Sequence, residues 1–536
     1  MMKKLKQCIA SLLAAISCFS LFACGRTSSN SNNEGSSVSG TINSGDPNGD
    51  SSSTPNYTGP KEEIQIYFWR SGLGEDFITK VISNFEKKYP QYRVKFDSTT
   101  WVGTISNYLG LEDADKVDLW MFDQAGVLGR LTEYAEPLDD ILTSNAYGDS
   151  VTIGSKFRAD VLETFKNADG HYYSLPYGGG TISLVYDADI IDDLNYAVPY
   201  TTNELEALVG ELSNAGHAPF MNFVGGGYWG FIYKVWQAQY DGYDYYNNNF
   251  LTLTDDIGNS PSLSVLTKAD GRRKALDVLE GIMTPQSVAE GSNGYQFTEA
   301  QTNFLNGEAV MMANGAWLMN EMKDSTDVSG NYAMMKIPVI SSIIEKTPSI
   351  ANDTELIHVI NAIDKYNDWT EVPLSAKRYE VKAEDMEYVF KARNMMFSSY
   401  ASSSFIIPTY SNQKAGAREF MKYYYSDEAL EVYFNETRML PIANLANKEL
   451  DKSTLSDWEN NLMNFGLNSI PLAETTASTS VMFLRSGCQP FAGLDIITLL
   501  SNANSQQRKN AQQIWDDMTG LFNGKWSGWL KDAGVS

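Results

Sequence analysis

The chain contains few of the residue patterns that mark an enzyme active site. It has no G-x-S-x-G elbow, no Walker A loop, no H-E-x-x-H motif and no C-x-x-C pair. Its only histidines are His171, His217 and His358, which are too few for a histidine-based metal cluster. We therefore predict neither a metal site nor a cofactor.

One phosphate-type motif does occur. Residues 225–230 read G-G-G-Y-W-G and satisfy the G-x-G-x-x-G pattern. A dinucleotide site also needs an acidic residue at a strand end about 20 residues further on, and none is there. Two interpretations stay open: a flexible glycine turn, or a loop that lets Tyr228 and Trp229 approach a ligand.

The many carboxylates leave two further interpretations open, glycoside hydrolysis and calcium binding. A glycoside hydrolase needs two carboxyl groups about 5 to 10 Å apart, and 66 Asp and Glu residues cannot exclude such a pair. Residues 241–249, D-G-Y-D-Y-Y-N-N-N, offer oxygen ligands for calcium but lack the EF-hand spacing and its closing Glu. Hydrolysis therefore remains an alternative, and structural calcium stays open.

Aromatic residues are the most informative side chains, with 11 Trp, 30 Tyr and 24 Phe. Several stand beside turn residues or at the ends of expected strands. Such rings can stack on the apolar face of a sugar while neighbouring polar groups bond its hydroxyls, although burial of any single ring is at least as plausible. The hypothetical ring platforms are Trp69, Trp101, Tyr177, Tyr228, Trp229 and Trp317.

The first residues of the chain predict export. Lys3, Lys4 and Lys6 precede an uncharged, mostly apolar run over residues 9–23, and together they form the basic and apolar regions of a signal peptide. The run is shorter than the roughly 20 residues that a spanning helix needs. We expect residues 1–23 to be a signal peptide and the body to be exported without spanning the membrane.

Cys24 is the expected site of lipidation. Residues 21–25, L-F-A-C-G, resemble a bacterial lipobox, although an ordinary signal peptide cleaved near Ala23 is the alternative. Residues 25–60 are almost wholly Ser, Asn, Gly, Thr, Asp and Pro and cannot bury enough surface to fold. We expect residues 24–60 to tether the body by a lipid to the outer face of the bacterial cell membrane.

The net charge and the cysteine content exclude two further classes of protein, nucleic-acid binders and disulfide-stabilised proteins. The formal net charge of −25 repels phosphate backbones, so we predict no nucleic-acid partner. Cys8 and Cys18 lie in the signal peptide and Cys24 would be acylated, which leaves Cys488 alone in the body. No disulfide framework is possible, so the hydrophobic core must supply stability.

From Lys61 onward, strand and helix periods alternate. A succession of strand, helix and strand of this length predicts an α/β unit with a parallel sheet and right-handed crossovers. Capping boxes at Thr201/Glu204 and Thr298/Gln301 predict two further helices. The expected elements are strands at 63–68, 92–96, 117–121 and 309–312, a helix with the apolar stripe Phe77, Val81, Ile82 and Phe85, and helices at 415–425 and 427–434 separated by Ser426.

Most of the body resembles one family, the extracellular solute-binding lipoproteins of ABC importers, in the maltose-binding-protein-like group that takes oligosaccharides. Each matching segment is loose alone, but their order after a lipobox and tether is specific. They are I-Y-F-W-R-S-G (66–72), F-E-K-K-Y-P (85–90), V-D-L-W-M-F-D (117–123), L-T-E-Y-A-E-P-L-D-D (131–140), D-G-H-Y-Y-S-L-P-Y-G-G-G (169–180), L-V-Y-D-A-D (184–189), F-L-N-G-E-A-V-M-M-A-N-G-A-W (304–317) and A-R-E-F-M-K-Y-Y-Y-S-D-E-A-L (417–430).

The resemblance implies an α/β, two-lobed periplasmic-binding-protein-like fold with a ligand cleft between the lobes. Asp123 falls where the family often places a carboxylate that bonds sugar hydroxyls, and Trp317 where it often stacks a ring. Trp69 and Tyr177 would face the cleft. Tyr228 and Trp229 lie in the second lobe, where aromatic platforms are common. Substrate binding is thus expected at Trp69, Trp101, Asp123, Tyr177, Tyr228, Trp229 and Trp317.

The resemblance also implies the function: non-enzymatic capture of a carbohydrate, a neutral oligosaccharide, by a monomer that delivers it to ABC importer permease subunits. A secreted glycoside hydrolase and a binding lipoprotein for peptides or other solutes are the alternatives. Residues 247–264 and 349–384 look like insertions. The expected lobes are 61–177 with about 339–400, and 178–338 with about 401–536.

Overall fold

The structure is a computed structural model that describes residues 57–98, 117–122, 132–255, 260–325, 328, 330–372, 381–398, 403–466, 469–472, 480, 482–483 and 486–535. The body divides into two compact units. In its described part, the N-terminal unit comprises residues up to Gly178 together with Ser403–Leu450. The C-terminal unit comprises Gly179–Ser402 and Asp451–Ser536.

The N-terminal unit is built on a mixed sheet with the strand order β2-β1-β3-β10-β4. β1 pairs in parallel with β2 and β3, as the sequence predicts, whereas β10 is antiparallel to both β3 and β4. The chain leaves this unit after Gly178 and returns at Ser403, where the Tyr177 N–H donates to the Ser403 carbonyl at 3.0 Å. Departing and returning segments therefore run side by side in opposite directions. The strands are β1 (Glu62–Phe68), β2 (Tyr92–Asp97), β3 (Leu119–Phe122), β4 (Leu175–Pro176) and β10 (Ser404–Ile406).

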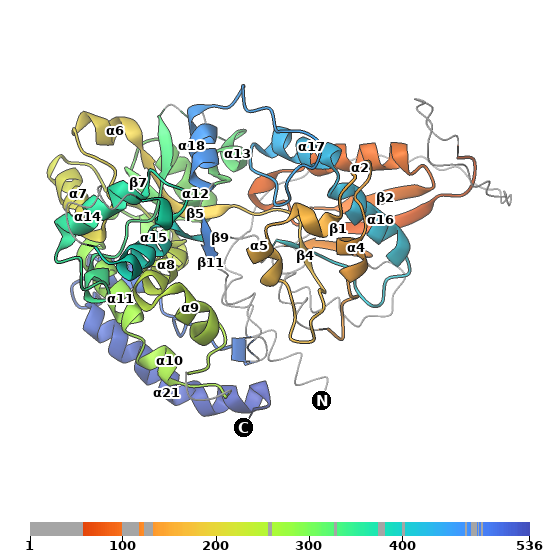
Figure 1. The fold of residues 1–536 in the computed structure, drawn as a ribbon. Helices are drawn as coiled ribbons and strands as arrows, with labels where there is room; N and C mark the ends of the chain where they lie inside the picture. Colours follow the sequence, from red (N-terminus) through yellow and green to blue (C-terminus); the bar gives the residue numbers. More distant parts are fainter. Residues whose placement is uncertain are drawn as a thin grey trace. The chain divides into compact units, whose positions relative to one another are not determined.

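Helices cover this sheet. α2 packs on β2, α16 packs on β1, and α17 packs on α2 (Figure 1). The apolar stripe predicted for α2 is confirmed, because Phe77, Val81, Ile82 and Phe85 are all buried. Ser426 caps α17 by accepting a hydrogen bond from the Ala429 N–H, also as predicted. The helices are α2 (Asp76–Lys88), α4 (Asp139–Thr143), α5 (Ala159–Glu163), α16 (Lys414–Tyr424) and α17 (Asp427–Thr437).

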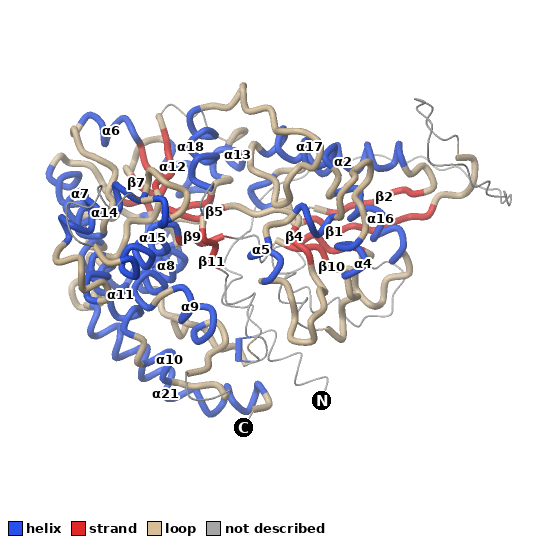
Figure 2. Tube along the Cα trace, viewed as in Figure 1, coloured by secondary structure: helices blue, strands red, loops and turns tan. Residues whose placement is uncertain are grey.

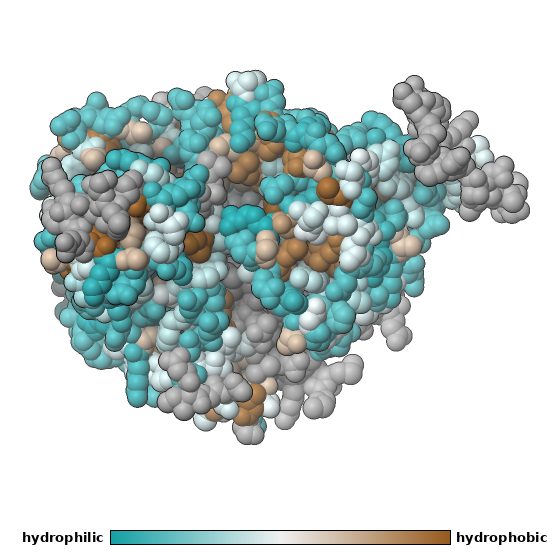
Figure 3. All heavy atoms as spheres, viewed as in Figure 1, coloured by the Kyte–Doolittle hydropathy of each residue, from teal (hydrophilic) through white to brown (hydrophobic). Residues whose placement is uncertain are grey.

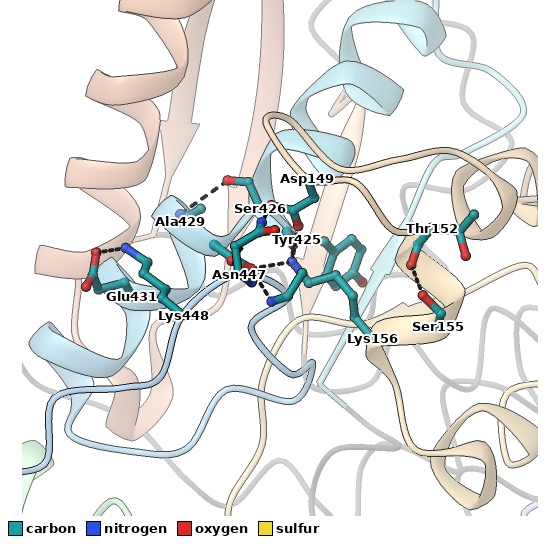
Figure 4. Close-up of polar contacts among 12 residues, drawn as sticks. Asp149, Thr152, Ser155, Lys156, Tyr425, Ser426, Ala429, Glu431, Asn447 and Lys448 are labelled. Carbon is teal, nitrogen blue, oxygen red and sulfur yellow. Dashed lines mark hydrogen bonds and ion pairs between the residues drawn. The ribbon is translucent and has the colours of Figure 1, made fainter.

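A buried lysine joins distant segments of the N-terminal unit. Lys156, at the end of the 3-10 helix η3 (Ile153–Lys156), is only 2% exposed. Its Nζ donates to the Tyr425 carbonyl at 2.7 Å and to the Asp427 carboxylate at 2.8 Å, and it also pairs with Asp149 (Figure 4). Buried charges are stable only when they are paired. The lysine therefore ties η3 to the start of α17.

The Asp427 carboxylate also holds the segment that ends this unit. Its oxygens accept hydrogen bonds from the N–H groups of Ala446 and Asn447, both at 2.7 Å. Burial alone would raise the pKa of Asp427, but the hydrogen bonds from Lys156 and these two N–H groups outweigh it and lower the pKa. The ionised carboxylate thus fixes the chain just before Leu450, where the unit ends.

The C-terminal unit is larger and also has a mixed sheet. Its order is β11-β9-β5-β7-β6, and β8 pairs with β5 outside this path. β5 is antiparallel to β7, β8 and β9, whereas β6 with β7 and β11 with β9 are parallel pairs. The strands are β5 (Thr181–Asp187), β6 (Phe220–Met221), β7 (Met311–Gly315), β8 (Tyr332–Met335), β9 (Met395–Ser398) and β11 (Ile470–Leu472).

The C-terminal unit contains many helices in addition to its sheet (Figure 2). α8 packs on β5 and β9, and α11 lies between α8 and α21. A separate core cluster joins Val185 of β5 and Met312 of β7 to Phe304 of α12, Leu318 of α13 and Leu462 of α18. The helices are α6 (Ala188–Asp193), α7 (Thr202–Asn214), α8 (Trp229–Asp241), α9 (Tyr243–Tyr245), α10 (Ser264–Thr267), α11 (Asp270–Ile282), α12 (Phe297–Leu305), α13 (Leu318–Met322), α14 (Asp353–Ile363), α15 (Ala383–Asn394), α18 (Asp457–Gly466), α20 (Ile496–Ser501) and α21 (Ala511–Ala533).

The extent of the units differs from the sequence-based expectation. Residues 339–400 lie in the C-terminal unit, and residues 403–450 lie in the N-terminal unit, the reverse of what we expect from the sequence. The reason is strand pairing: Phe397 of β9 pairs with Ile182 of β5, and Phe405 of β10 pairs with Met121 of β3. Periodicity predicts that a strand exists, but it does not say which sheet the strand joins.

Two local predictions in this unit need adjustment. The capping box of α12 is formed by Gln296 and Glu299, so Thr298 lies inside the helix. β7 occupies Met311–Gly315 and so ends three residues later than expected. The capping of α7 by Thr201 is confirmed, because its side chain accepts from the Glu204 N–H.

On the face seen in Figure 3, hydrophilic residues cover most of the described surface, with smaller apolar patches between them. Among the described helices, none combines the length and the apolar composition required to cross a bilayer.

Candidate functional site

The Trp317 indole occupies the space beside two glycines, Gly315 at the end of β7 and Gly180 directly before β5. A β-carbon on Gly315 would lie 2.3 Å from the indole Cζ2, and one on Gly180 would lie 2.8 Å from Cε3. Real β-carbons essentially never approach other heavy atoms this closely, so the ring keeps its place only because both positions lack a side chain. The N-G-A-W sequence that ends β7 thus holds a half-buried tryptophan against backbone.

Tyr228 lies next to this tryptophan, with ring centroids 6.1 Å apart. It also contacts Phe297 at 5.5 Å, Phe231 at 5.5 Å and Phe223 at 5.6 Å. We call these five residues the aromatic cluster. Phe223 is fully buried, whereas the other four are only partly buried. The cluster therefore keeps aromatic surface on which an apolar ligand face can stack.

The glycine motif forms the turn that carries Tyr228. Gly225, Gly226 and Gly227 have φ angles of +79°, +78° and +58°, which larger residues rarely adopt. A β-carbon on Gly226 would also lie 2.9 Å from the Asp495 carboxylate. The motif is therefore a tight turn packed against the residue that caps α20, and α8 begins directly after Tyr228.

A chain of amides links this turn to α20. Asn222 donates to the Asn293 side-chain oxygen at 2.7 Å, and Asn293 donates to the Ser501 hydroxyl at 2.9 Å. Sequence reasoning misses α20, because the contact joins segments more than 200 residues apart. It also misses Phe231 and Phe297, although Phe231 follows Tyr228 by one helical turn and could have been found from that spacing.

Two ionisable groups adjoin the cluster. The Lys234 Nζ lies 5.2 Å from the Phe231 ring centroid, and this lysine is 5% exposed. The Glu321 N–H donates to the Trp317 carbonyl at 2.8 Å. Burial raises the pKa of Glu321 to about 7, against a hydrogen bond from Gln301 that lowers it.

Trp69, which the sequence predicts to bind the substrate, lies at the end of a strand in the N-terminal unit. It directly follows β1, and its N–H donates to the Met121 carbonyl at 2.8 Å. Its ring lies 6.0 Å from that of Phe122, at the end of β3, and is partly buried. Trp101 and Asp123 lie outside the described residues.

Two sequence-predicted platforms are in the core instead. Trp229 is 1% exposed and packs on Phe220 and Trp236, with centroids 5.0 and 6.5 Å away. Tyr177 is also 1% exposed and packs on Phe68 and Phe405. Trp229 is the first residue of α8, whereas Tyr228 precedes the helix as its N-cap.

The remaining predictions concern metals and the lipid. Among the described residues, no group of three or more His, Cys, Asp or Glu side chains could hold a metal ion. The stretch proposed for calcium continues from the end of α8 through α9 to the π-helix η5 (Tyr246–Phe250). Cys24 lies outside the described residues.

A comparison with protein-family models establishes the family of this chain. The family model for bacterial extracellular solute-binding proteins matches residues 71–431, more than half of the chain. The chain belongs to this family. The family description names the binding of solutes outside the cell. The family resemblance expected from the sequence is thereby confirmed.

Relatives of this solute-binding protein include carbohydrate binders. A maltotriose-binding protein from Pyrococcus abyssi (strain GE5 / Orsay) is 24% identical over 208 residues, 38% of this chain and 37% of the relative. The match thus spans little more than a third of that relative.

Solved structures give the fold. The solute-binding protein RafE in complex with raffinose matches with a TM-score of 0.56 at 14% identity, over 87% of this chain and 99% of RafE. The apo-form of RafE from Streptococcus pneumoniae matches with a TM-score of 0.55, also at 14% identity, over 87% and 99%. At these identities the likeness establishes the two-lobed α/β fold alone.

Proposed function

We propose that this protein is the substrate-binding component of an ABC importer that captures a neutral oligosaccharide outside the cell. The observation that carries the proposal is the aromatic cluster, in which Trp317 and Tyr228 are held beside each other by glycines. Partly exposed rings fixed against backbone suit the flat apolar faces of pyranose units. The maltotriose and raffinose named for two relatives are neutral trisaccharides, which supports the same ligand class.

The binding energy requires polar contacts as well as stacking. Micromolar affinity corresponds to about −8 kcal/mol, and each stacked ring contributes roughly 0.5 to 1.5 kcal/mol. Hydroxyl hydrogen bonds must supply the rest, and Asp123 is the proposed carboxylate for them. Capture by lobe closure, which the permease subunits would recognise, is part of the same proposal.

Titration calorimetry against a sugar panel tests the ligand class. We would titrate the purified protein with maltotriose, raffinose, a uronic-acid trisaccharide and a tripeptide. We expect saturable one-to-one binding of a neutral oligosaccharide. Binding of the tripeptide alone would overturn the carbohydrate proposal in favour of a peptide-binding lipoprotein.

The same mixtures test the alternative of a secreted glycoside hydrolase. We expect the bound sugar to be recovered intact by chromatography after prolonged incubation. Release of reducing ends in proportion to protein concentration would favour the hydrolase.

Export and anchoring are the second part of the proposal. We infer that Cys24 is lipidated and that residues 24–60 tether a monomeric body to the outer face of the bacterial cell membrane. The family supports export. Cells making wild-type protein should retain it in the detergent phase of a Triton X-114 partition, and Cys24→Ala should shift it to the aqueous phase. Equal partition of the two proteins would contradict lipidation.

A further inference from the structure

A carboxyl group and an amide form a hydrogen bond one helical turn after Trp317. Glu321 lies in α13, one helical turn after Trp317, and its N–H donates to the Trp317 carbonyl at 2.8 Å. Its Oε2 accepts a hydrogen bond from Gln301 Nε2 at 2.8 Å. Gln301 belongs to α12 and is fully buried. The pair therefore links α12 to the short helix that follows the Trp317 backbone.

The oxygen of the Gln301 side-chain amide lacks a hydrogen-bond partner among the described residues. Gln301 Oε1 is buried and accepts no hydrogen bond within the described part of the chain. Leaving a buried acceptor unsatisfied costs about 1 to 3 kcal/mol. An ionised carboxylate cannot relieve it, because a carboxylate only accepts hydrogen bonds, whereas a protonated carboxyl group has one O–H to donate.

The neutral acid and the amide complement each other. The Glu321 O–H would donate to Gln301 Oε1 while Gln301 Nε2 continues to donate to the other carboxyl oxygen. This cyclic arrangement satisfies every polar atom of both groups except the second amide hydrogen. One proton would thus explain both the unsatisfied Gln301 oxygen and the raised pKa of Glu321.

In the described part of the chain, no charged group is among the causes that shift the pKa of Glu321. Burial and the Gln301 amide are the causes acting on its pKa, which lies near 7. On the elements beside it, Glu299 in the first turn of α12 accepts a hydrogen bond from the Gln296 N–H, and Lys323 and Asp324 beyond α13 are exposed. The neighbouring strand β7, with the sequence M-M-A-N-G, has no titratable side chain.

We propose that Glu321 is a positioning residue for ligand binding, whose neutral form pairs with Gln301 and thereby holds the backbone of Trp317 in place. The inference rests on the proposed role of the aromatic cluster. Ionisation removes the O–H donor, leaves Gln301 Oε1 without a partner and loosens α13. Ligand affinity therefore falls as pH rises through about 7.

The proton also affects stability without any ligand. The folded-state pKa of about 7 lies above the ordinary value of 4.5, so the folded protein binds the proton more tightly than the unfolded chain. The resulting stabilisation is present at low pH and is lost as pH rises from about 4.5 to about 7. Glu321→Gln, which keeps one donor and one acceptor but cannot ionise, should not show this loss.

The first test is the thermal midpoint of the full chain between pH 5 and pH 8.5 without sugar. We expect the wild-type midpoint to fall relative to that of Glu321→Gln as pH rises, and to run parallel to that of the exposed control Glu308→Gln. The comparison cancels other buried acids such as Asp241, whose pKa burial raises to about 6. Parallel curves for wild type and Glu321→Gln would overturn the acid–amide pair.

The second test separates positioning from stability. Hydrogen exchange of residues 317–323, corrected for intrinsic rates, should be at least threefold faster in wild type at pH 8 than at pH 6, and equal at the two pH values in Glu321→Gln. Equal protection in wild type would overturn the positioning role.

Maltotriose affinity is the final measurement. We expect the wild-type Kd to rise threefold or more from pH 6 to pH 8, and the Kd of Glu321→Gln to stay constant. A constant wild-type Kd would overturn the positioning role. If maltotriose does not bind wild type at any pH, the proposed ligand fails, while midpoint and exchange still decide the inference about Glu321.

Discussion

The Trp317 indole lies where any side chain at residue 180 would have to stand, with its Cε3 2.8 Å from the β-carbon position of Gly180. Gly180 begins the segment that leads into β5, and Trp317 follows the neighbouring strand β7. The Trp317 ring can therefore keep this orientation only because residue 180 is a glycine. This relationship gives the most direct test of the aromatic cluster.

Replacing Gly180 with alanine should displace the Trp317 ring. Because overpacking of this kind typically costs 1 to 3 kcal/mol, we expect a loss of about that size in the free energy of unfolding, measured with urea. The affinity for the sugar identified by calorimetry should fall as well. Gly210→Ala is the matched control, because Gly210 lies on the exposed face of α7 with no atom near its β-carbon position. It should be neutral or stabilising by up to about 1 kcal/mol. Wild-type affinity in Gly180→Ala would show that the ring is not held there.

Removing the Trp317 ring should weaken sugar binding. We expect Trp317→Ala to raise the Kd tenfold or more, equivalent to about 1.4 kcal/mol, while circular dichroism shows an intact fold. Trp526→Ala, on the C-terminal helix α21 and outside the cluster, should retain wild-type affinity. An unchanged Kd in Trp317→Ala, measured by calorimetry, would remove Trp317 from the site.

Removing the Lys156 charge should destabilise the N-terminal unit. Lys156→Met leaves the carboxylates of Asp149 and Asp427 buried without their cation, and breaking a buried pair in this way costs about 3 to 5 kcal/mol. Denaturant unfolding followed by fluorescence measures the loss. Lys448→Met is the control, because Lys448 pairs with Glu431 at the surface, where such pairs contribute less than about 1 kcal/mol. Similar losses in both variants would contradict the importance of burial.

The body thiol should be unreactive while the protein is folded. Cys488 is 2% exposed, and burial raises its pKa to about 12 despite the opposing charge of Arg272. In a chain made without residues 1–60, where Cys488 is the only cysteine, we expect no reaction with Ellman's reagent at pH 8. Full reaction should follow in denaturant. Rapid labelling under native conditions would show that the region around Cys488 opens.

Local patterns predicted much of the secondary structure. The apolar stripe of α2, the Ser426 cap of α17 and the strand β1 follow from neighbouring residues, and the structure confirms them. The capping box of α12 was missed because the usual pattern begins with Ser or Thr, whereas Gln296 occupies the N-cap. The helix begins at Phe297 and buries Ala300, Gln301 and Phe304 in the core, which places Thr298 inside it.

The sequence by itself determined the family, the elements and the presence of many aromatic residues near turns. Only the tertiary structure decided which of those rings pack together in a partly exposed cluster. Tyr228 and Trp229 are neighbours in sequence, yet Tyr228 packs on Trp317, whereas Trp229, the first residue of α8, fills the core. The need for glycine at Gly180 likewise appears only when β5 and β7 pair. Chain-distant contacts carry this information, and local sequence periodicity does not contain them.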